Sequence, residues 1–97
     1  MEKSHIKKLK ALAHKLKPIV TIGQHGMKDS INDELASALK HHQLLKIKVN
    51  VGDRDARDTL IDELATNHKA ELIHRIGNIA VLYRRNFNKE NLLKENT

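Results

Sequence analysis

The sequence contains no cysteine, which excludes disulfide bonds and thiolate metal sites and is consistent with a reducing compartment. Aromatic rings are almost absent too, since Tyr83 and Phe87 are the only Phe, Tyr or Trp residues. Modules that read single strands by stacking need several exposed rings, so this mode of recognition is disfavoured. No apolar run approaches the ~18 residues of a membrane-spanning helix. We therefore expect a soluble, cytoplasmic protein.

Motifs for catalysis and metal binding are also missing. The chain has no H-E-x-x-H, Walker or G-x-S-x-G pattern. Among its seven histidines, His41 and His42 are adjacent, so on a helix their side chains would point about 100° apart. We predict no catalytic residue, no metal, no cofactor and no small-molecule substrate. An RNA-modifying enzyme is a disfavoured alternative because no nucleophile or cofactor loop is visible.

The chain does contain enough aliphatic residues for one hydrophobic core. Leu, Ile and Val supply 26 of its 97 residues, which suits a single two-layer domain and leaves no room for a second. We assign residues 1–85 to this domain. Residues 86–97 are rich in Asn and Lys and are expected to form a flexible or loosely docked tail.

The positive charge is concentrated at one end of the sequence. Residues 1–28 hold seven Lys and one acid, a balance of +6, which equals the net charge of the whole chain. The remaining residues hold eleven basic and eleven acidic side chains. A general solubility charge would be spread out, so a localised one indicates an electrostatic binding surface for an anionic polymer.

The first predicted helix carries two stripes. Ser4 is a plausible N-cap, and the helix is expected to run to Pro18, which would end it. Its inward stripe would be Ile6, Leu9, Ala13 and Leu16, and its basic stripe Lys3, Lys7, Lys10, His14 and Lys17. Exposed lysines are ordinary on a solvated face. A basic amphipathic helix could also lie on an anionic membrane, but the small apolar stripe is needed by the core.

A Gly-x-x-Gly loop follows the first predicted strand, residues 19–22. Its residues are Gly23, Gln24, His25 and Gly26, and Lys28 precedes a helix that Asp29 or Ser30 would cap. Two glycines let backbone N–H groups approach a phosphate, and the helix start adds partial positive charge. The same pattern also fits a plain strand-to-helix turn. Its place after the basic segment favours a phosphate site.

The remaining pattern completes an α-β-α-β-α-β-β order. Leu45, Ile47, Val49 and Val51 alternate with Lys46, Lys48 and Asn50, as in a half-buried strand with a basic outer face, although these lysines could merely protect a sheet edge. A helix over 54–67 would bury Ala56, Leu60, Leu64 and Ala65. Strands at 72–76 and 79–84 form a hairpin through Gly77-Asn78. We predict an α/β, two-layer fold with a four-stranded mixed sheet.

The outer face of the third helix is predicted to be acidic, carrying Asp55, Asp58, Asp62 and Glu63. It would repel phosphate and so face away from a nucleic acid. An alternative function is therefore a protein–protein adaptor that binds a basic partner protein through this helix.

Four short motifs, in order and at the right spacing, resemble the CRM domain (chloroplast RNA splicing and ribosome maturation). They are Ala13-His14-x-Leu16-x-Pro18, Ile22-Gly23-x-x-Gly26, Leu44-Leu45-Lys46-Ile47-Lys48 and Val81-Leu82-Tyr83-Arg84. The resemblance covers about residues 4–85 and is strongest to bacterial stand-alone members of the YhbY type. It departs after Gly26, where Met27-Lys28 replaces a common Leu-Thr, and at Asn67-His68-Lys69, where a Gly is common.

The resemblance implies a fold similar to the C-terminal domain of translation initiation factor 3. It also implies RNA binding through a KH-like Gly loop and association with rRNA in large-subunit precursors. For the adaptor alternative, it implies a role in ribosome assembly with a basic ribosomal protein as the partner of the acidic third helix. Arg84 would match the family's Arg after Leu-Tyr. The combined expectation is a monomeric, non-enzymatic RNA-binding protein that contacts RNA through Gly23, Gln24, His25, Gly26, Lys28, Lys7, Lys10, Lys17, Lys46, Lys48 and Arg84.

Overall fold

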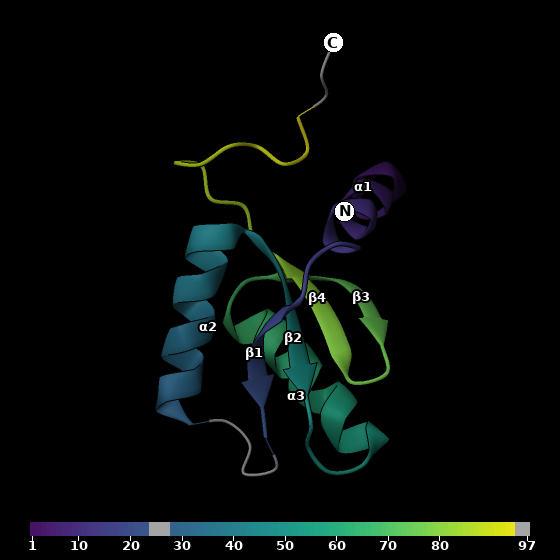
Figure 1. The fold of residues 1–97 in the computed structure, drawn as a ribbon, viewed down its shortest axis with the longest axis vertical. Helices are drawn as coiled ribbons and strands as arrows, with labels where there is room; N and C mark the ends of the chain where they lie inside the picture. The colour runs from purple at the N-terminus through teal and green to yellow at the C-terminus, as the bar shows by residue number, and fades with distance from the viewer. Residues whose placement is uncertain (24–27, 95–97) are drawn as a thin grey trace.

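The computed structural model describes residues 1–23 and 28–94, which form three helices and four strands (Figure 1). Their order confirms the predicted α-β-α-β-α-β-β arrangement. The elements are α1 (Lys3–Ala13), β1 (Pro18–Ile22), α2 (Asp29–His42), β2 (Leu44–Val49), α3 (Arg54–Asn67), β3 (Glu71–Ile76) and β4 (Ile79–Tyr83).

The four strands form one mixed sheet in the order β1-β2-β4-β3. β1 and β2 are parallel, with α2 as their crossover, while β4 pairs antiparallel with both β2 and β3. The β3–β4 turn uses Gly77 at φ +57°, a conformation that favours glycine. The mixed sheet is therefore confirmed, and its last strand lies inside it rather than at an edge.

One face of the sheet is covered by α2 and α3. The core cluster on this face takes alternate residues of the strands and the inner stripes of both helices. Its fully buried members include Ile22, Leu35, Ile47, Ile61 and Leu82, each with no exposed surface. The alternation of buried and exposed residues in β2 agrees with the prediction for a half-buried strand.

On the opposite face, α1 covers one end. Leu9 and Ala13 of this helix pack on Leu44, Ile73, Val81 and Tyr83. Tyr83 is only 4% exposed, so it offers no ring for stacking on a ligand. Within residues 1–23 and 28–94, no helix lies over the rest of this face, toward the carboxyl end of β2 (Figure 1). We call it the open face: the positions of the four strands that point away from α2 and α3 and lie beyond α1.

The predicted start and end of the first helix are wrong. The N-cap is Glu2, without a side-chain hydrogen bond, and Ser4 lies inside the first turn. The helix ends at Ala13, and a turn in which Leu16 N donates to Ala13 O leads to β1. Pro18 forces the preceding residue toward extended backbone, so the helix stops a turn early. Leu16 is consequently 38% exposed rather than part of the apolar stripe.

The predicted N-cap of α2 is wrong, whereas the predicted start of α3 is confirmed. Lys28 occupies the N-cap position of α2 with no side-chain hydrogen bond, so neither Asp29 nor Ser30 is the cap. The helix over 54–67 is confirmed, and the carboxylate of Asp53 accepts from Ala56 N at 2.9 Å. Ala56 is predicted to be buried but is exposed. The buried residues of α3 are Ile61, Leu64 and Ala65.

The tail after β4 contacts the domain as far as residue 94. Leu92 and Leu93 pack against the cluster under α1. Gln43, a buried polar residue with φ +63°, donates from Nε2 to Glu90 O at 2.7 Å. The Arg85 guanidinium donates to Gln43 Oε1 and to the Asn86 and Lys89 carbonyls.

Candidate nucleic-acid interface

The basic stripe of α1 exists in the structure as an exposed row. Lys3, Lys7 and Lys10 flank one shallow depression on the solvent side of the helix, together with Ile6. Lys17, beyond the end of the helix, is exposed just before β1. The apolar stripe is buried at Leu9 and Ala13. Since the core uses the apolar side of α1, its lysines face solvent.

A second set of lysines lies on the open face. Leu44, Lys46 and Lys48 alternate with buried residues of β2, so they share the face that α1 partly covers. Leu44 is buried under α1, Lys46 is half-buried and Lys48 is exposed. β2 pairs with β1 on one side and β4 on the other, so these lysines stand on a central strand and do not protect an edge.

Gly23, the first residue of the Gly-x-x-Gly segment, and α1 lie at opposite ends of β1 (Figure 1). Gly23 follows the carboxyl end of β1, where Asn50 N donates to Ile22 O at 2.8 Å. Gly23 and α1 are thus separated by the length of β1. Lys46 and Lys48 lie on β2, which pairs with β1 along its length. The basic side chains therefore follow a path along the open face.

Of the Gly-x-x-Gly residues and the lysine that follows them, the structure describes Gly23 and Lys28. Both are exposed. A Cβ placed on Gly23 would have no heavy atom within 4 Å, so the fold does not require glycine there for space. The predicted contacts of Gln24, His25 and Gly26 lie outside the described residues.

Arg84 is separated from the lysines. Its guanidinium donates to Ala36 O at 3.1 Å and to His68 O at 3.0 Å, joining α2 to the end of α3. Both acceptors belong to the layer that covers the opposite face. The same guanidinium, second to burial, lowers the pKa of His68. Arg84 therefore occupies a structural position in this fold.

The outer face of α3 is less acidic than the sequence predicts. Asp58 lies 3.6 Å from both Arg57 Nε and Arg75 Nε and 3.9 Å from Arg54 Nε. Arg75 also reaches Asp62 at 4.0 Å. Because arginines of α3 and β3 pair with these carboxylates, much of the acidic charge is compensated within the domain. This removes part of the basis for a purely acidic docking helix.

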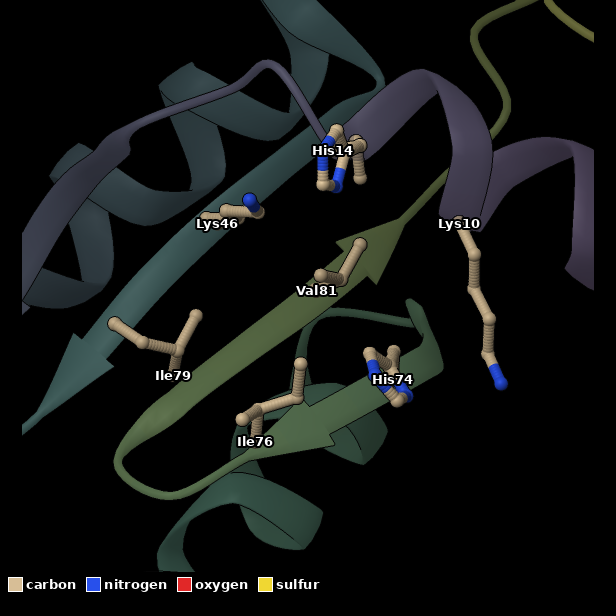
Figure 2. Close-up of a pocket in the computed structure, with 8 residues that line it drawn as sticks. Lys10, His14, Lys46, His74, Ile76, Ile79 and Val81 are labelled. Carbon is tan, nitrogen blue, oxygen red and sulfur yellow. The ribbon is translucent and has the colours of Figure 1, made fainter.

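Sequence reasoning missed a groove between α1 and the open face (Figure 2). Its volume is about 360 Å³, and it is lined by Lys10, Ala13, His14, Lys46, His74, Ile76, Ile79 and Val81. Strand alternation alone puts His74 with Ile76, and Ile79 with Val81, on common faces. The sequence does not reveal which face stays open, because that depends on where α1 packs.

Two negative observations apply to residues 1–23 and 28–94. Within these ranges, no three His, Asp or Glu side chains gather as metal ligands. No helix in them is long and apolar enough to cross a membrane.

The protein is thus a small α/β domain in which two helices cover one face of the sheet and lysines lie on the other, open face. The CRS1/YhbY (CRM) domain family matches residues 1–84, and the chain belongs to this family. This confirms the resemblance found in the sequence.

Relatives agree with this assignment. An RNA-binding protein of Haemophilus influenzae is 41% identical over 76 residues, covering 78% of this chain and 77% of its own. A protein of Pseudomonas aeruginosa named as a probable RNA-binding protein is 36% identical over 80 residues, covering 82% and 77%. The solution structure of a candidate RNA-binding protein from Staphylococcus aureus superposes with a TM-score of 0.78 at 28% identity, covering 94% and 93%.

Proposed function

We propose that this chain is a non-enzymatic, monomeric, cytoplasmic RNA-binding protein that associates with structured rRNA in precursors of the large ribosomal subunit and assists their assembly. The main support for RNA binding is the path of lysines that runs from α1 along the open face. Lys7, Lys10 and Lys17 begin this path, and Lys46 and Lys48 extend it toward Gly23. The names of the bacterial relatives support the same class of ligand.

The proposed mechanism rests on phosphate contacts. Lysines along the path attract the RNA backbone, and Gly23, Gln24, His25 and Gly26 with Lys28 hold a phosphate near the start of α2. Tyr83 is buried, so the domain has no array of exposed rings to read bases in series. Residues 1–85 form the RNA-binding domain in this proposal, and residues 86–97 form its tail.

The lysine path is tested by the salt dependence of RNA binding. Lys10→Ala and Lys46→Ala should each weaken binding to a large-subunit rRNA fragment and reduce the slope of log K against log salt by about 1. Lys40→Ala is the matched control, because Lys40 is an exposed lysine of α2, on the opposite layer. Equal slopes for all three variants and the wild type would exclude the path from the interface.

The Gly loop is tested by Gly23→Val. Because a Cβ at Gly23 meets no neighbour, this variant should keep its melting temperature and lose RNA affinity by about tenfold. Gly77→Val is the control: strain at φ +57° should lower the melting temperature without changing RNA affinity. Unchanged affinity in Gly23→Val removes the loop from the mechanism.

The rRNA assignment needs a measurement in cells. Cross-linking the protein to RNA and sequencing the attached fragments should recover large-subunit rRNA, with reads that Lys10→Ala depletes. Predominant recovery of messenger or transfer RNA would contradict the ribosomal role and leave RNA binding intact.

A further inference from the structure

The groove between α1 and the open face combines two kinds of surface that rarely meet on a solvated sheet. Its floor is aliphatic, formed by Ile76, Ile79 and Val81 of β3 and β4. Ile76 is 65% exposed, although an open sheet face normally carries polar side chains. Ile76 lies opposite half-buried Ile79 in the β3–β4 pair, so the two form a contiguous apolar patch in a hollow, a surface typical of a ligand site.

The walls of the groove are basic. Lys46 stands on the β2 side and Lys10 on α1, and the floor lies between them (Figure 2). His14, the C-cap residue of α1, and His74 of β3 add two rings that lie sixty positions apart in the chain. None of the eight lining residues is acidic. The charge complementarity is therefore with an anion that also has an apolar face.

We propose that this groove holds one unstacked nucleobase of the bound RNA, a step that rests on the proposed RNA-binding function. The base lies on Ile76 and Ile79, and His14 and His74 contact its face or edge. Neutral imidazole offers one donor and one acceptor, which suits the polar edge of a base. Lys10 and Lys46 hold the phosphates on either side of that nucleotide.

The size and setting of the groove favour this occupant. A volume of about 360 Å³ lies at the small end of the range for ligand clefts, roughly 300–1000 Å³, and fits a single nucleotide better than a peptide segment. An anionic membrane would need a free apolar helix face, but Leu9 and Ala13 of α1 are 0% and 1% exposed. The groove also lies on the lysine path, so a bound RNA backbone would cross it.

The experiment compares two hairpin RNAs that differ by one bulged adenosine. The wild type should bind the bulged hairpin about five- to tenfold more tightly. Ile76→Ser and His74→Ala should lose this preference while keeping affinity for the unbulged hairpin. Ile19→Ser is the matched control, since Ile19 is a 46% exposed isoleucine of β1 that does not line the groove, and it should keep the preference.

NMR titration identifies the ligand chemistry directly. AMP should move the amide signals of His74, Ile76 and Ile79, whereas ribose phosphate and inorganic phosphate should not. Equal shifts with ribose phosphate would reduce the groove to an anion site and overturn the proposal. Shifts with anionic lipid micelles or polyglutamate, but not with AMP, would overturn it in favour of a membrane or an acidic peptide.

Failure here is distinguishable from failure of the proposed function. If both hairpins bind equally and Lys10→Ala still lowers the salt slope, the groove proposal is wrong and RNA binding stands. If neither hairpin nor the rRNA fragment binds, the proposed function itself is wrong. Because Ile76 is largely exposed, its variant should fold, and an unchanged melting temperature verifies this.

Discussion

The two faces of the sheet differ in how completely they are buried, and the difference separates stability from binding. Under α2 and α3, the strand residues Val20, Ile22, Ile47, Val49 and Leu82 are at most 1% exposed. On the other face, burial falls along β2 from Leu44 beneath α1 to exposed Lys48. A face that is already filled can only hold the fold together. The partly filled face keeps side chains available for a ligand.

Charge follows the same division. Helices α2 and α3, with the cap Asp53, contain eight of the twelve acidic residues of the chain. The lysines of α1 and β2 lie on the other side of the sheet. Arginines pair with Asp58 and Asp62, but the other six carboxylates keep this layer acidic, so a polyanion would be attracted to the lysine side before any contact forms.

The largest expected effect is the loss of stability when a buried side chain of the helix-covered face is truncated. Ile47→Ala should lower the free energy of unfolding by about 2–5 kcal/mol, since the side chain is fully buried and its loss leaves a cavity. Urea denaturation measures this. Ile79→Ala, on the half-buried open face, should cost less than half as much. Equal losses would contradict the division into a structural face and a binding face.

A smaller loss of stability is expected on substitution of Arg84. This variant compares the RNA contact that the family resemblance implies with the structural hydrogen bonds that are observed. Arg84→Met removes two charge-assisted hydrogen bonds to the Ala36 and His68 carbonyls and should cost about 1–3 kcal/mol of stability. RNA affinity should stay within about twofold when measured below the unfolding transition, because a phosphate contact is not lost. A large loss of affinity at unchanged stability would restore Arg84 to the RNA interface.

The sequence predicts the fold well because its signals are local and agree with one another. Pro18, the alternation from Leu45 to Val49 and the Gly77-Asn78 turn each define an element on their own. Helix ends are harder, since Leu16 continues the apolar period of α1 yet lies beyond its end. Periodicity cannot show that Pro18 already constrains the residues before it.

The candidate site is predicted only in part. The spacing of Lys7, Lys10, Lys46 and Lys48 predicts their positions on the solvent side of α1 and on the open face of β2, while their role in RNA binding stays a prediction. The groove is missed because His14 and His74 come to line one hollow only through tertiary packing of α1 on β3 and β4. Arg84 follows the family motif, but its partners, the Ala36 and His68 carbonyls, are set by long-range contacts that no local pattern encodes.

The smallest expected effect is a pH dependence confined to the covered side. Burial first, and Arg84 second, lower the pKa of His68, whose Nε2 lies 3.0 Å from Asn32 Oδ1. The unfolded chain therefore binds a proton at a higher pH than the folded one. The stabilisation by His68 is complete above its unfolded pKa of about 6.5 and is lost as pH falls through the folded value. His68→Gln should flatten this decline relative to the wild type.

NMR titration of the imidazole measures the same quantity directly, and a His68 pKa at or above about 6.5 would contradict the assignment. The Arg84→Met variant sharpens the test. Removing the guanidinium should raise the pKa of His68 only part of the way back, because burial is the larger cause. Full recovery would mean that charge, rather than burial under the covered face, sets the pKa of this residue.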